Sequence, residues 1–197
     1  GSLAEIHNND LSGASGGSGI AVQSSRAIIH GNNIGPIGGW NGLWLIGSFD
    51  VDAQNNTISD IAREPVIAGD YWAGDNPDVR RLYFANNQVS TPGTGSCQSN
   101  THWGGEFTCP VVMVHRAGAT LVDNVFTAGG TADGIRATGA LLNVQRNTWN
   151  LNAAGAVIQN FDTGAAGAQQ YGSLAFFTDN QWNGVTSTYD VTKSSVT

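Results

Sequence analysis

An asparagine that recurs along almost the whole chain of 197 residues constrains the fold more than any other feature. Successive copies are 23, 24, 31, 37, 23 and 33 residues apart, and the residues two positions after and three and five positions before each copy are apolar. Alternation with a period of two indicates a β-strand that buries one face. We therefore predict such a strand before each of the seven marker asparagines, which are Asn9, Asn32, Asn56, Asn87, Asn124, Asn147 and Asn180.

A second strand is predicted further upstream in each repeat. Its apolar pairs are Ile20 with Val22, Trp44 with Ile46, Val66 with Ala68, Val112 with Val114, Ile135 with Ala137, and Val157 with Ile158. A short third strand follows each marker, and no stretch of ten residues has a helical period. A 23-residue repeat of this kind fits one rung of a parallel β-helix, in which neighbouring rungs pair at about 4.8 Å.

The whole pattern predicts an all-β solenoid of about seven rungs that forms a single domain over residues 3–197. We interpret residues 1–2 as a scar of tag cleavage and residues 187–197 as an added strand or partial rung. Open solenoid ends need polar caps or further chain, so we expect this domain to be excised from a longer protein.

The recurrence of asparagine itself has two explanations. Its side-chain amide can bond to the same amide on the rungs above and below, which forms a ladder that satisfies buried polar groups. Alternatively, asparagine is simply a turn residue that tolerates a left-handed backbone. We favour the inward ladder, because only this residue keeps its identity in every repeat.

Two segments, Ile6–Leu11 (IHNNDL) and Leu82–Val89 (LYFANNQV), show the repeat most clearly. From about Leu3 to Asn183 the chain resembles the right-handed parallel β-helix superfamily of pectate-lyase-like solenoids. This superfamily includes polysaccharide lyases, hydrolases and epimerases, phage tailspikes, and noncatalytic surface stalks. The resemblance therefore implies a right-handed parallel β-helix, whereas the activity has to be argued from particular residues.

Charge and hydropathy exclude two classes of partner. The chain has 15 acidic and 8 basic residues, a formal net charge of −7 and a single lysine, so it lacks the basic surface that nucleic acids require. No apolar run approaches the roughly 18 residues of a membrane span, so we expect no membrane insertion.

Extra residues in the three long intervals form insertions at 70–79, 90–110 and 162–172, on both sides of the upstream-strand sheet. The outward positions of that sheet are predicted to be Gln23, Gly47, Gly69, His115, Arg136 and Asn160. We expect a shallow groove over this sheet, because the insertions form walls beside it. Sugar-binding clefts combine aromatic rings with carboxylates and arginines, which the insertions contain. Its candidate ligand-binding residues are Asp70, Tyr71, Trp72, Asp75, Arg80, His102, Trp103, Glu106, His115 and Arg136.

Trp40, Arg63 and Glu64 are expected on rungs next to this groove. The alternative for the insertions is that Trp72 and Trp103 fold back and only cover the bases of the loops.

Cys97 and Cys109 both lie in the longest insertion. A disulfide between them would stabilise the loop by roughly 3 kcal/mol and suits an extracellular or cell-surface protein. Free thiols, or two metal ligands joined by His102, are the alternatives. The spacing of these residues is not that of a zinc site, so we predict the disulfide.

Catalytic signatures of the superfamily are missing from the sequence. The Asn-Thr-Asp, Asp-Asp and Gly-His-Gly motifs of its hydrolases and the Asp-Pro-His motif of its epimerases do not occur. Arg116 or Arg136 could serve as the base of a lyase, but we find no carboxylate cluster beside them. Asp50 and Asp52 are expected to point outward as a solvated pair. We predict no metal and no cofactor, with calcium as the ion that such a fold could use.

The expected function is therefore an extracellular or cell-surface β-helix module that binds a polysaccharide or surface glycan without catalysis. A polysaccharide lyase or hydrolase is one alternative, and a passive stalk, adhesin or tailspike segment is the other. The single glycosylation sequon is Asn55-Asn56-Thr57. It contains the marker Asn56, which we expect to be buried, so the sequon gives little information about function.

Overall fold

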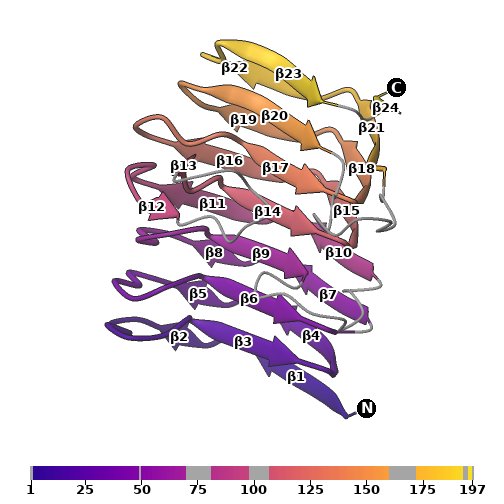
Figure 1. Cartoon of the computed structure of the whole chain (residues 1–197). Helices are drawn as coiled ribbons and strands as arrows, with labels where there is room; N and C mark the ends of the chain where they lie inside the picture. Colours follow the sequence, from indigo (N-terminus) through magenta and orange to yellow (C-terminus); the bar gives the residue numbers. More distant parts are fainter. Residues whose placement is uncertain are drawn as a thin grey trace, which may run out of the picture.

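The computed structural model describes residues 2–48, 50–69, 81–97, 107–159, 172–192 and 195–196. The described chain winds through three parallel sheets that run the length of the solenoid (Figure 1). Sheet A consists of β1 (Leu3–His7), β4 (Arg26–His30), β7 (Asp50–Gln54), β10 (Arg81–Ala85), β15 (Gly118–Val122), β18 (Leu141–Gln145), β21 (Leu174–Thr178) and β24 (Ser195–Val196). It contains the strands predicted before the markers.

Sheet B follows the markers and consists of β2 (Asp10–Leu11), β5 (Asn33–Ile34), β8 (Thr57–Ile58), β11 (Gln88–Thr91), β16 (Val125–Ala128), β19 (Thr148–Asn150) and β22 (Gln181–Asn183). Sheet C contains the upstream strands β3 (Ile20–Gln23), β6 (Leu43–Ile46), β9 (Val66–Gly69), β14 (Val112–His115), β17 (Ile135–Thr138), β20 (Ala154–Gln159) and β23 (Ser187–Thr192). The predicted seven-rung parallel β-helix is confirmed, and β23 with β24 forms the added partial rung.

Strand register confirms the buried columns that the repeat predicted in sheets A and B. Phe84 pairs with Ala53 on one side and with Leu121 on the other, and Leu121 pairs with Val144. All four of these side chains are buried. In sheet B, the column two residues after the markers includes a stack of aromatic rings from Phe126 and the two tryptophans of β19 and β22.

The phase predicted for β6 is wrong by one residue. Leu43 and Leu45 are the buried residues of this strand, whereas Trp44 and Ile46 face outward. The corner between β6 and β7 has three residues where the corresponding corner between β3 and β4 has two, and this extra residue accounts for the 24-residue interval. In β20, Ala156 and Ile158 point inward in place of the predicted Val157 with Ile158, because neighbouring residues of a strand face opposite sides.

The markers form the predicted ladder. The backbone N–H and side-chain Nδ2 of each of the first six markers donate to Oδ1 of the marker on the next rung, at 2.8–3.0 Å. The five inner markers are almost completely buried. The left-handed turn belongs to the residue before each marker, with φ near 50–65° in every rung. The markers therefore form the ladder, and the left-handed backbone conformation belongs to the residue before each of them.

No helix occurs among the described residues, and so no helical segment in that part of the chain could cross a membrane.

Candidate functional site

The outer face of sheet C was predicted to carry the site, and two of its candidate residues are described. His115 on β14 and Arg136 on β17 both face outward from neighbouring strands. His115 is only 3% exposed, and Nη2 of Arg136 donates to Oδ2 of Asp133 at 2.8 Å. The structure thus brings these two candidates to one face. The other eight, Asp70, Tyr71, Trp72, Asp75, Arg80, His102, Trp103 and Glu106, lie outside the described residues.

Apolar side chains occupy much of the same face. Ile67 and Met113 are buried next to each other, and Trp44 packs against them. Trp40 is 42% exposed and its ring meets that of Trp44 edge to face, with centroids 5.7 Å apart. The predicted outward position at Gly47 is wrong, because Ile46 pairs with Gln23 and Gly47 forms the corner.

A buried carboxyl group, that of Glu64, lies two residues before β9, an inner strand of sheet C. Oε2 of Glu64 accepts a hydrogen bond from Nδ2 of Asn41 at 2.8 Å and lies 3.6 Å from Nε of Arg63. Burial raises the pKa of the Glu64 carboxyl, and Arg63 opposes this shift. Because Glu64 is completely buried, this group fits a structural link between rungs better than contact with a ligand.

The predicted disulfide lies partly outside the described residues. The hairpin of β12 (Ser96–Cys97) and β13 (Phe107–Thr108) pairs Cys97 with Phe107, and the N–H of Cys109 donates to the carbonyl of Gly95. The side chain of Cys97 is not described, so the disulfide stays a prediction.

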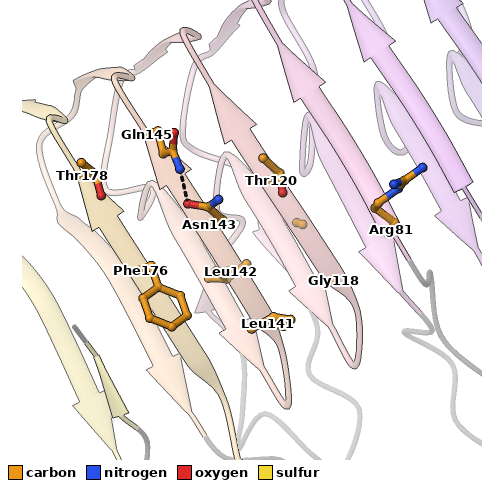
Figure 2. Close-up of a pocket in the computed structure, with 10 residues that line it drawn as sticks. Arg81, Gly118, Thr120, Leu141, Leu142, Asn143, Gln145, Phe176 and Thr178 are labelled. Atoms are coloured by element: carbon orange, nitrogen blue, oxygen red, sulfur yellow. Dashed lines mark hydrogen bonds between the residues drawn. The ribbon is translucent and has the colours of Figure 1, made fainter.

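A hollow of about 600 Å³ lies on the outer face of sheet A (Figure 2). A second hollow of about 500 Å³ follows it toward the N-terminal rungs. Arg81 and Thr120 line both hollows, so the two hollows adjoin each other across the strands of sheet A. We call this surface the sheet A groove. Its outward lining includes Arg26, Asp50, Asp52, Arg81, Tyr83, Thr120, Leu141, Asn143, Gln145, Phe176 and Thr178.

Charged side chains gather in the N-terminal half of the sheet A groove. Asp50 lies between two arginines, with Oδ1 3.2 Å from Nε of Arg81 and Oδ2 3.9 Å from Nε of Arg26. Oδ1 of Asp52 accepts from Gln54 at 2.7 Å and lies 3.3 Å from Nε2 of His30. Asp50 and Asp52 point outward, as predicted, and each already has partners.

The C-terminal half of the groove combines amides with apolar side chains. Nε2 of Gln145 donates to Oδ1 of Asn143 at 2.8 Å, as the dashed line in Figure 2 marks. Phe176 on β21 pairs with Asn143 in register and is 41% exposed, and Leu141 at the edge of the groove is 56% exposed. Exposed ring faces and fixed amides on one surface suit a ligand with alternating apolar faces and hydroxyl groups.

The groove is poorly equipped for hydrolysis. A general acid of a glycosidase is a carboxyl shielded from water, whereas the side chains of Asp50 and Asp52 are 44% and 41% exposed. Among the described residues, no three His, Cys, Asp or Glu side chains are grouped so that they could hold a metal ion. The described residues therefore offer no site for the calcium ion that members of the resembled superfamily can use.

Sequence reasoning missed the sheet A groove, although a signal was present. The position four residues before each marker faces outward, and in four successive rungs it holds Tyr83, Thr120, Asn143 and Phe176. The outward residues of these strands differ in type from rung to rung, so the repeat does not mark them as one surface.

Comparisons of the chain with protein families, with curated proteins and with solved structures found no match.

Proposed function

We propose that this protein is an extracellular or cell-surface β-helix module, related to the pectate-lyase-like solenoids, that binds a glycan in the sheet A groove without cleaving it. One observation carries the proposal. The two adjoining hollows of the groove together span several rungs and present exposed aromatic rings together with planar polar groups.

The aromatic rings are suited to stack against sugars. Tyr83 is 38% exposed and Phe176 is 41% exposed, and Thr120 and Asn143 lie between them in the same outward column. The two rings are three strand steps apart, which is about 14 Å at the usual strand spacing. A pyranose in an extended chain advances by about one such step, so a linear glycan that runs across the strands can meet both rings.

The polar groups supply orientation. The side chains of Arg26 and Arg81 lie beside Asp50 and are 64% and 71% exposed, so their guanidinium groups are accessible to hydroxyl or carboxylate groups of a ligand. The Asn143 and Gln145 amides offer further donors and acceptors. A preformed surface of this kind limits the entropy lost on binding.

The test is a panel of polysaccharides scored with three readouts. Retardation in affinity electrophoresis reports binding, ultraviolet absorbance reports the unsaturated ends that a lyase forms, and new reducing ends report hydrolysis. We expect retardation alone. Absorbance or reducing ends would establish the enzyme instead, and no response to any glycan would favour the stalk.

Variants then locate the binding surface. Tyr83→Ala and Phe176→Ala should each weaken binding by about 1 to 3 kcal/mol, by analogy with stacking of nucleobases on aromatic side chains. Trp40→Ala is the matched control, because Trp40 is equally exposed but lies near sheet C. Weakened binding in Trp40→Ala alone would move the site to the face of sheet C.

A further inference from the structure

The sequon Asn55-Asn56-Thr57 has its acceptor at Asn55, one residue before the buried marker. Asn55 and Thr57 are both exposed, while Asn56 between them is buried in the ladder. We infer that Asn55 is a site for an N-linked glycan. This inference rests on the extracellular or cell-surface location that we propose, and it is independent of the binding proposed for the sheet A groove.

Local geometry leaves the Asn55 side chain available. Asn55 is the left-handed corner residue of its rung, with φ of 55°, and its backbone N–H donates to the carbonyl of Ala85 at 3.1 Å. None of the hydrogen bonds formed among the described residues uses its side-chain amide, which therefore projects into solvent without a competing partner. Thr57 begins β8 with its side chain also outward.

Space at the corner is sufficient for an attached sugar. The corresponding corner residue on one neighbouring rung is Gly31, which has no side chain, and on the other it is the exposed Asn86. The buried bonds of Asn56, to Asn87 and to the carbonyl of Ile29, point away from this corner. A glycan on Asn55 would therefore leave the ladder intact.

The equivalent corners of other rungs explain why one site is expected. Asn8 and Asn86 have the same left-handed conformation as Asn55. The residue two positions after them is Asp10 or Gln88, so neither forms a sequon. Thr57 is thus the feature that distinguishes Asn55 among three asparagines in the same setting.

The reaction needs a lipid-pyrophosphate-linked oligosaccharide as the glycosyl donor. The side-chain nitrogen of Asn55 forms a bond to C1 of the first sugar, the bond between C1 and the pyrophosphate oxygen breaks, and the lipid pyrophosphate leaves while the amide loses one proton. No oxidant or reductant is involved. The exposure of Asn55 in the folded rung accommodates the product.

The experiment is secretion of the full chain, behind a leader and a short linker that carries a reference sequon, from eukaryotic cells that perform N-glycosylation. Peptide mapping after enzymatic deglycosylation identifies each occupied asparagine by its conversion to aspartate. We expect Asn55 to be occupied in the folded secreted protein and to lose its glycan in Thr57→Val. Gln88→Thr should add a second glycan at Asn86, the matching corner of the next rung.

Two results would overturn the inference. The first is an unmodified Asn55 in molecules whose reference sequon is occupied. The second is occupancy of Asn55 only in protein whose circular dichroism lacks the β-sheet signal of unglycosylated protein, because a glycan at this corner would then be incompatible with the fold.

Discussion

Replacement of Asn87 by alanine tests the asparagine ladder at its centre. Oδ1 of Asn87 accepts from the backbone N–H and Nδ2 of Asn56, and its own Nδ2 donates to Oδ1 of Asn124 and to the carbonyls of Ala53 and Ala85. The substitution removes all five bonds and leaves the buried N–H of Asn56 without its acceptor. An orphaned buried donor costs about 1–3 kcal/mol, and each of the five lost bonds costs about 0.5 kcal/mol, the low end for a net hydrogen bond. We expect a loss of about 4 kcal/mol.

Asn9→Ala is the matched control, because Asn9 occupies the same corner at the exposed end of the ladder. Its side chain donates to His7 and Asn32, and none of the described residues donates to its Oδ1. We expect a loss of about 1 kcal/mol or less, since water can replace these bonds. Urea unfolding followed by tryptophan fluorescence measures both values, provided that the m-values agree. Equal losses in the two variants, or a loss below about 1 kcal/mol for Asn87→Ala, would refute the ladder as a buried network.

Three further predictions concern the insertion and the sheet C corners. Alkylation of the unreduced protein should leave Cys97 and Cys109 unmodified, and two labelled thiols in the mass spectrum would disprove the disulfide. Burial raises the pKa of the Glu64 carboxyl above its ordinary value, so its protonated form contributes stability that is lost as the pH rises through the raised pKa. The stability of the wild type relative to Glu64→Gln should therefore fall in urea titrations as the pH rises above the ordinary carboxyl range, and a rise would contradict this assignment. Gly69→Ala should lower the urea midpoint strongly, because φ is +121° and a Cβ would collide with the carbonyl of His115; an unchanged midpoint would show that the corner can relax.

The sequence predicts the parts of the fold that repeat along the chain. The columns through Phe84 and Phe126 and the ladder through Asn87 follow from positions fixed relative to one marker, so the insertions between rungs do not disturb them. The phase of β6 could not be obtained in this way, because it depends on whether the corner before β7 holds two or three residues.

The sheet A groove is a property of neighbouring rungs and not of the repeat. Tyr83 and Thr120 are 37 residues apart in sequence but pair directly in register, and Asn143 and Phe176 are brought together across 33 residues. Their residue types share no pattern that marks them as one surface. Only the strand register shows that they line a common groove.

Mapping of a bound oligosaccharide by amide chemical shifts tests the central claim, that the sheet A groove binds a glycan, most directly. The protein, at 20.5 kDa, is small enough for assigned spectra, and the titrant is a linear fragment of whichever polysaccharide retards it. We predict that the largest shifts fall on β10, β15, β18 and β21, at and beside Tyr83, Thr120, Asn143 and Phe176. Shifts confined to β14 and β17, around His115 and Arg136, would contradict the claim and place the ligand on sheet C.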